Sequence, residues 1–254
     1  MASVTWRPTA SSGNSHSGTA DSYSGWLCFS SGSEEAVYTN VHTYIDDSTA
    51  DDTSTEICAR SASTTVETFS VDLTFSGTAI PSNAKVSSYT LYVRGYTNSK
   101  PSSLTATATT KTSSSTTIKA HDISSINTAD GTYVTKSFSQ TTTSIPNKMN
   151  LTVKIKDTSA DDKVATDLRI TQIYIVINYD LYYTTTVTQT TGGTISVSPS
   201  GEQKSGTTIT ITASPNSGYV LDKYIVNGTN TTTATFSLTS NTTVSASWIL
   251  NMFI

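Results

Sequence analysis

Residues 148–156 read Lys-Met-Asn-Leu-Thr-Val-Lys-Ile-Lys. Apolar and polar side chains alternate through the whole stretch, and successive side chains of a β-strand point to opposite faces. Met149, Leu151, Val153 and Ile155 therefore share one face, and the lysines, asparagine and threonine share the other. The pattern predicts a strand whose sheet is buried on one face and in contact with water on the other.

The same period of two recurs on both sides of this strand. It predicts further strands near residues 69–75, 89–93, 103–110, 115–120 and 132–140, and one along the stripe of Val37, Thr39, Val41, Thr43 and Ile45. Residues 170–179 carry apolar side chains on both faces, as expected for a strand that is central or at an interface. Turn signals separate these strands and no helical period is present, so the pattern predicts a jelly-roll-like β-sandwich.

The composition agrees with an all-β chain. Of the 254 residues, 35% are hydrophobic and 13% are charged, which excludes a membrane protein and a charge-rich disordered chain. Threonine and serine fill the difference, and threonine suits the wet face of a strand. The formal net charge is −4 and no run of Lys or Arg forms a basic stripe, so we expect no nucleic acid partner.

The chain divides into four predicted parts. Residues 1–35 are rich in Ser and Gly without a sustained period, which predicts an irregular N-terminal arm. Residues 36–180 form the sandwich, and Asp180 to Tyr183 form a short linker. Residues 184–248 alternate in a tighter rhythm, typical of short strands in a small module. Residues 249–254 form an apolar tail, which is far too short to span a bilayer.

Specific markers follow one another in the module. They are Gly193 to Pro199, Ser205-Gly206-Thr207, Ile209 to Pro215, Gly218-Tyr219, Asn227-Gly228 and Asn241 to Trp248. These residues resemble the bacterial repeat module of internalin B type. The resemblance implies a small β-grasp-like module, used as a spacer or adhesive unit on bacterial surface proteins and phage virion proteins, and it implies no catalysis. Tyr224 and Trp248 stand where the family usually has Trp and Phe.

A second resemblance concerns the sandwich. Residues 79–86, which lead into Tyr89-Thr90-Leu91, and the closing strand over residues 173–179 are similar to sandwich domains of phage and surface proteins.

One acidic loop is a candidate metal site. Asp46, Asp47, Asp51 and Asp52 offer hard oxygen ligands to Ca²⁺, without the spacing of an EF-hand. Aspartate also favours solvated loops, which is the alternative interpretation. We expect no cofactor other than such a calcium ion.

Cys28 and Cys58 are the only cysteines. Either they form one disulfide in an oxidising setting, or they are two separately buried thiols.

The residues available for catalysis make no site. His16, His42 and His121 are interpreted as surface histidines, because no GxSxG elbow, HExxH or phosphate loop accompanies them. A glycosidase needs two carboxylates that face each other, and the five glutamates are scattered over different predicted loops and strand faces. We therefore predict that the protein is not an enzyme, and a hydrolase has no residue constellation behind it.

Two features favour binding. Several tyrosines provide either packing or flat stacking surfaces for sugar rings or a protein partner: Tyr38, Tyr44, Tyr92, Tyr174, Tyr182, Tyr183 and Tyr219. The apolar patch at the C-terminus is costly to expose and is a candidate partner interface. It consists of Trp248, Ile249, Leu250, Met252, Phe253 and Ile254.

Two hypotheses about function follow. The first is a non-enzymatic phage virion component, such as a head decoration, head-fibre or tail-associated protein, at the virion surface. Its partners would be other virion proteins or further copies of itself in a homo-oligomer, and a cell-surface glycan. The absence of an ordinary signal peptide from the N-terminus favours it. The second is a fragment of a bacterial cell-surface adhesin or carbohydrate-binding protein. Both place the chain outside the cell.

Overall fold

A computed structural model of the chain describes residues 1–17, 26–30, 33–35, 40–49, 52, 55–61, 65–98, 101–128, 131–156 and 166–251. These residues form two compact units. The larger, called the sandwich, comprises Ser3–Ile80 and Val86–Asn178, and the smaller, called the module, comprises Met1–Ala2, Pro81–Lys85 and Tyr179–Ile254.

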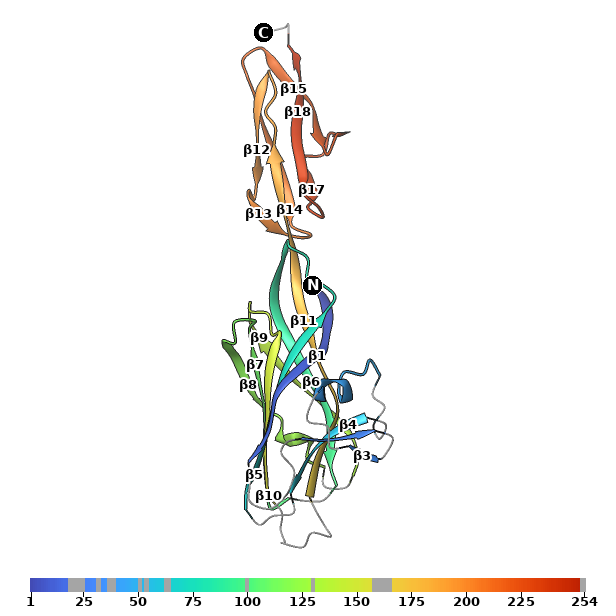
Figure 1. Ribbon diagram of the computed structural model, residues 1–254. Helices are drawn as coiled ribbons and strands as arrows, with labels where there is room; N and C mark the ends of the chain where they lie inside the picture. The colour runs from blue at the N-terminus through green and yellow to red at the C-terminus, as the bar shows by residue number, and fades with distance from the viewer. Residues whose placement is uncertain are drawn as a thin grey trace. The chain divides into compact units, whose positions relative to one another are not determined.

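The sandwich is built almost entirely of strands (Figure 1). Two short 3-10 helices, η1 (Val41–Tyr44) and η2 (Ser124–Ile126), connect them. The strands are β1 (Ala2–Ser17), β2 (Leu27–Ser30), β3 (Ser33–Glu35), β4 (Thr55–Ser61), β5 (Glu67–Gly77), β6 (Ala84–Thr97), β7 (Ser103–Lys111), β8 (Thr117–Asp122), β9 (Val134–Thr141), β10 (Lys148–Lys156) and β11 (Thr166–Val187).

The strands make two layers. One layer has the order β1-β5-β10-β7-β8, and the other is formed by β3-β2-β4-β11-β6-β9. Strand β1 also pairs with β11, so the sheet curls round and closes on that side. The predicted all-β class and β-sandwich are confirmed. Among the described residues, no helix is long and apolar enough to cross a bilayer.

Alternating side chains from both layers fill the core. The four apolar residues of β10 are at most 1% exposed, as the alternation predicts. Apolar side chains of β5, β6 and β11 complete the core: Phe69, Val71, Leu73, Phe75, Tyr89, Leu91, Val93, Ile173, Ile175 and Ile177. Trp26 is fully buried, and its ring centroid lies 6.0 Å from that of Phe69. The hydrophobic effect of this burial dominates the stability of the sandwich.

The strand predicted through Val37 and Ile45 is wrong for its second half. Residues 41–44 form η1, and residues 36–39 lie outside the described residues. Val41, the first residue of η1, and Ile45, which follows its end, are both fully buried. Thr43, halfway between Val41 and Ile45, completed an apparent period of two in the sequence.

Two predicted segments without regular structure overlap strands. The arm is a strand over residues 2–17, where β1 pairs with β5 in an antiparallel ladder with two irregularities. Residues 2–10 do alternate, with Val4 and Pro8 buried, and the alternation stops in the Ser-rich residues 11–17. Those residues stay in the strand because backbone hydrogen bonds to β5 do not depend on the side chains. The linker at 180–183 is part of β11, which continues unbroken to Val187.

The module has two small sheets. They use the end of β11 with β12 (Gly193–Ser198), β13 (Glu202–Lys204), β14 (Thr208–Pro215), β15 (Tyr219–Val226), β16 (Thr229–Thr231), β17 (Thr235–Ser237) and β18 (Thr242–Leu250). One sheet has the order β12-β14-β17, and in the other β16, β15 and β18 follow one another, with β18 parallel to the end of β11.

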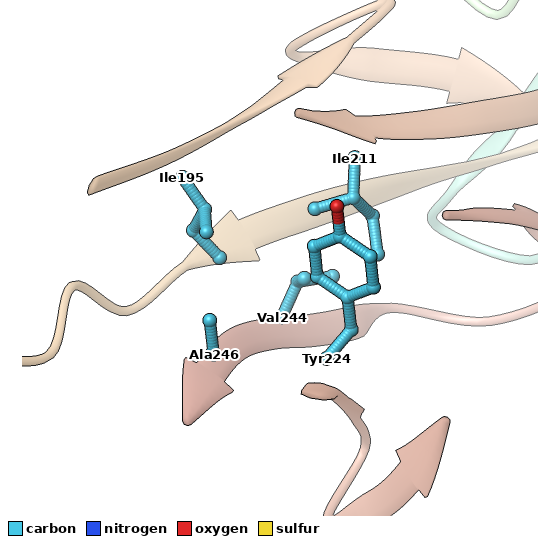
Figure 2. Packing of buried hydrophobic residues seen from close by; sticks show 5 residues of the cluster. All are labelled: Ile195, Ile211, Tyr224, Val244 and Ala246. Atoms are coloured by element: carbon cyan, nitrogen blue, oxygen red, sulfur yellow. The ribbon is translucent and has the colours of Figure 1, made fainter. Parts of the chain in front are cut away.

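Figure 2 shows the core between these sheets, where Tyr224 packs with Ile195, Ile211, Val244 and Ala246. These residues come from strands of both sheets, so each sheet covers the apolar face of the other.

The expected hairpin at Asn227-Gly228 is confirmed. Val226 pairs with Thr229, and the two residues between them have φ angles of 48° and 78°. Positive φ at both central positions is the type I′ geometry that Asn-Gly favours.

The apolar tail begins later than predicted. Strand β18 continues through Ile249 and Leu250, which pair with Val220 and Tyr219. Met252, Phe253 and Ile254 lie outside the described residues.

His121 is buried, so its interpretation as a surface histidine is wrong. Only 6% of the residue is exposed, and its Nε2 lies 2.8 Å from the hydroxyl of Tyr89 on the opposite layer. The same hydroxyl lies 2.5 Å from Thr110 Oγ1. Burial, with repulsion from Lys119, lowers the pKa of His121 from its ordinary value of 6.5.

We expect the sandwich to lose stability on acidification through His121. Its pKa is near 6.5 in the unfolded chain and lower in the folded one, so between these values the unfolded state binds more protons. Stability is complete above about pH 6.5 and falls below it. The measurement compares melting temperatures from pH 7.5 to 5 for the parent and His121→Gln, which should show a smaller decline.

Candidate binding face of the sandwich

The outer face of β6 and β9 carries an ordered set of polar and aromatic side chains. On β6, Tyr89, Leu91 and Val93 are fully buried, so the alternating residues Thr90, Tyr92, Arg94 and Tyr96 point outward. On β9, the outward residues Thr135, Ser137 and Ser139 are exposed.

The ring of Tyr92 stacks on the ring of a tyrosine in the neighbouring strand β11. Its ring lies 4.6 Å from that of Tyr174 on β11, centroid to centroid, and the planes differ by 7°. Arg7 of β1 places its guanidinium carbon 5.1 Å from the centre of the Tyr174 ring. Strands β6 and β1 flank β11 on opposite sides, so both faces of Tyr174 are covered. The pair is therefore a rigid ridge, and Tyr174 is no flat platform.

The second face of Tyr92 has only small neighbours. It is turned toward β9, where the residue opposite Tyr92 in the ladder is Ser137. Strand β9 pairs with β6 alone among the strands that the structure describes, so it is the edge of the sheet. A serine is too short to cover an aromatic ring, and Tyr92 is partly exposed, so this ring face borders solvent as far as the described residues are concerned.

Hydroxyl groups surround the free ring face. Thr90 Oγ1 and Ser139 Oγ lie 3.0 Å apart, and Arg94 Nη1 donates to Thr135 Oγ1 at 3.2 Å. We call the set of Thr90, Tyr92, Arg94, Thr135, Ser137 and Ser139 the Tyr92 strip. It offers one apolar surface between donors and acceptors of hydrogen bonds.

The charge of Arg94 is neutralised. Its Nε and Nη2 donate to the two carboxylate oxygens of Asp52, at 2.7 and 2.8 Å. A bidentate pair of this kind fixes the guanidinium and leaves little net charge. The Tyr92 strip is therefore electrically near neutral.

This ion pair bears on the predicted calcium site. Asp52 is engaged by Arg94, and Asp47 Oδ2 accepts a hydrogen bond from Thr55 at 2.8 Å. Asp51 lies outside the described residues, among which no three His, Cys, Asp or Glu side chains come together in a group that could hold a metal. Calcium binding by Asp46, Asp47, Asp51 and Asp52 stays a prediction.

A buried ionic network anchors the end of the face beyond Arg94. Arg169 pairs with Glu56 and Asp167, whose side chains are 3% and 2% exposed, and Arg60 Nε lies 2.9 Å from Asp167 Oδ1. Tyr133 donates its hydroxyl to Glu56 Oε2 at 2.7 Å. Burial, together with this hydrogen bond to a carboxylate, raises the pKa of Tyr133 far above its ordinary value.

Tyr96 of β6 connects the Tyr92 strip to this network through its contacts with Tyr133 and Arg169. Its ring meets the ring of Tyr133 edge-on, with centroids 4.4 Å apart. These contacts hold β6, β9 and β11 in a fixed relation, so the Tyr92 strip is preorganised.

The cysteines do not face one another in the ladder of β2 and β4. Cys58 lies opposite Leu27, and Cys28 lies opposite Ile57. Cys58 is a free, buried thiol. The side chain of Cys28 lies outside what the structure describes, so the choice between a disulfide and two separate thiols stays a prediction.

The predicted interface residues of the module have different surroundings. Trp248 donates its indole N–H to Thr190 Oγ1 at 2.8 Å and packs on the module core. Ile249 and Leu250 are 52% and 60% exposed at the end of β18. Their role in contacting a partner or another copy stays a prediction.

Sequence reasoning found part of the strip. It named Tyr92 and Tyr174 among seven tyrosines that provide either packing or stacking surfaces, and the structure brings these two together. It placed no role on Arg7, Arg94 or the hydroxyls of β9. The alternation of Tyr92, Arg94 and Tyr96 was a usable signal, because a period of two puts all three on one face. Tyr38 and the side chain of His16 lie outside what the structure describes.

Comparisons with known proteins match parts of the chain. Residues 183–251 match the family described as the divergent InlB B-repeat domain. A solved structure titled "CBM4 structure and function" is similar to the chain at 12% identity and a TM-score of 0.29, covering 60% of this chain and 94% of that one. No curated protein matches the chain. The family match reaches from residue 183 to Asn251, three residues beyond the predicted end of the module.

Proposed function

We propose that this protein is a non-catalytic binding protein outside the cell, whose sandwich binds a neutral carbohydrate along the Tyr92 strip. The module serves as a B-repeat unit that either displays the sandwich or itself adheres to a surface. The observation that carries the proposal is the free face of Tyr92, fixed from behind by Tyr174 and bordered by Ser137.

The chemistry of the strip suits a sugar ring. One face of a pyranose exposes C–H groups, which pack on an aromatic face, while its hydroxyls need donors and acceptors around the edge. Tyr92 supplies the aromatic face. The hydrogen-bond donors and acceptors are the hydroxyls of Thr90, Thr135, Ser137 and Ser139. The Asp52–Arg94 pair leaves no strong charge, which favours a neutral sugar.

The surroundings of His121 support binding without turnover. His121 contacts Tyr89 on the inner side of β6, whereas the Tyr92 strip is on the outer side. The imidazole is therefore separated from a ligand on the strip by the sheet itself, and a general base must lie within hydrogen-bond reach of its substrate.

Carbohydrate binding by the sandwich is compatible with both hypotheses about location. A phage virion component and a bacterial surface adhesin would each turn weak single contacts into firm attachment through many copies. The virion role and its homo-oligomer stay predictions, to be checked by the native mass of the chain in light scattering.

Affinity electrophoresis tests the proposal. The protein is run through gels that contain a soluble neutral polysaccharide, with β-glucan, xylan and mannan in separate gels. At least one should retard the parent, and Tyr92→Ala should weaken that retardation about tenfold, since it removes the stacking surface. Tyr92→Phe should keep most of it.

Two further variants make the result specific. Ser137→Phe should weaken binding by covering the free ring face, although Tyr92 is intact. Tyr182→Ala, a half-buried tyrosine of the module, is the matched control and should bind like the parent. Retardation that is unchanged in Tyr92→Ala, or absent with all three polysaccharides, would contradict the proposal.

A further inference from the structure

The other layer of the sandwich has a groove on its outer face. Its volume is about 330 Å³, and its polar lining consists of Ser12, Asp72, Thr74, Lys111, Ser115 and Lys148. They come from β1, β5, β10, β7 and the turn that follows β7. We call this space the lysine groove.

Register explains why these residues meet. Lys148 of β10 lies opposite Thr74 of β5 on one side and Lys111 of β7 on the other. One step along the same face, Asp72 lies opposite Asn150 and also opposite Ser12 of β1. The floor is formed by Leu73 and Met149, whose side chains point to the core.

The two lysines form a like-charged pair. Residues directly opposite one another in a ladder have Cβ atoms about 5 Å apart, and like charges at this distance are destabilising. Both side chains are half-buried, which limits how far the ammonium groups can separate. Within the described part of the chain, no carboxylate lies within ion-pair distance of either. An anion held between them would offset the repulsion.

The other groups of the groove restrict that anion. Lys148 Nζ donates to Ser115 Oγ at 3.1 Å, and Ser115 is held in a left-handed conformation with φ of 64°. Asn150 Nδ2 donates to Asp72 Oδ1 at 3.0 Å, which fixes that carboxylate. The charge of Asp72 disfavours a polyanion beside it, while its oxygens accept hydrogen bonds from hydroxyls.

We propose that the lysine groove binds a carboxylated sugar, such as a uronic acid residue of an acidic polysaccharide. The sugar carboxylate lies between Lys111 and Lys148, and its hydroxyls contact Asp72, Ser12, Thr74 and Ser115. Two positive charges and one negative charge match a monoanion that carries hydroxyls better than they match phosphate. This site is on the layer opposite the Tyr92 strip and does not depend on it.

Titration of the full chain with D-galacturonic acid, followed by ¹⁵N chemical shifts, tests the site. We expect saturable shifts around Ser12, Thr74 and Lys148. Lys111→Met and Lys148→Met should each weaken binding about tenfold, because each removes one charge-assisted hydrogen bond. Lys154→Met is the matched control, since Lys154 is on the same face of β10 but outside the groove, and it should bind like the parent.

Two further measurements test whether the groove is specific for a carboxylated sugar. Glucose, which lacks the carboxylate, should bind at least tenfold more weakly than galacturonic acid. Asp72→Asn should weaken galacturonic acid and strengthen inorganic phosphate, since it removes an acceptor and a repulsive charge. Absence of saturable binding, equal loss in Lys154→Met, or preference of the parent for phosphate would each overturn the proposal, whatever the outcome for Tyr92.

Discussion

Replacing Arg169 by methionine is expected to destabilise the sandwich by about 3–5 kcal/mol at neutral pH. The guanidinium of Arg169 lies between Glu56 and Asp167, whose side chains are 3% and 2% exposed. Without it, Glu56 loses its charged partner and retains only the hydroxyl of Tyr133, whereas Asp167 still has Arg60. Water cannot solvate them at that depth, so the cost is the desolvation of an uncompensated charge. Urea unfolding followed by circular dichroism measures it.

An exposed ion pair provides the comparison. Lys85 and Glu202 pair in the module with side chains 54% and 45% exposed. Lys85→Met should change the unfolding free energy by less than about 1 kcal/mol, because solvent screens such pairs. Similar losses in Arg169→Met and Lys85→Met would show that Glu56 and Asp167 are better solvated than the structure indicates.

Gly95→Ala should be about as damaging, for a steric reason. A Cβ at Gly95 would lie 2.2 Å from the carbonyl oxygen of Arg169, on the neighbouring strand β11. Backbone atoms cannot rotate away as a side chain does, so β6 and β11 would have to separate and weaken their ladder. We expect a loss of at least about 3 kcal/mol, at the upper end of what overpacking costs. Thermal and urea unfolding measure this loss.

Gly131→Ala is the control, because it replaces a glycine where the added methyl group meets no other atom. Gly131 has φ of 76° and no atom within 4 Å of an added Cβ. Its replacement should cost about 1 kcal/mol from backbone strain alone. Equal effects at Gly95 and Gly131 would mean that β6 and β11 accommodate the methyl group.

The Gly95 contact also links stability to the proposed binding. Tyr92 is three residues before Gly95 on β6, and its partner Tyr174 is on the same β11 that Gly95 approaches. The 4.6 Å stack requires these strands to stay at ladder distance. Gly95→Ala is therefore expected to weaken carbohydrate binding along with stability, whereas Gly131→Ala is not.

Periodicity alone determined most strands. The buried faces of residues 69–75, 89–93 and 148–156 followed from alternation, because a face that packs against a core must be apolar wherever it occurs. The Asn227-Gly228 hairpin followed from local sterics, since these two residue types accept positive φ. Such features depend on neighbours in the sequence and so are visible in it.

Pairing between distant residues was decided only by the tertiary structure. The second half of strand β1, residues 11–17, has no apolar period, and it forms where β5 offers its backbone groups. His121 looked like a turn residue until β6 placed Tyr89 against it. The Tyr92 strip and the lysine groove each join strands that are far apart in the chain, and register sets which side chains meet. Alternation determines the face on which a residue lies, but its partner depends on strand order, which comes from the free energy of the whole fold.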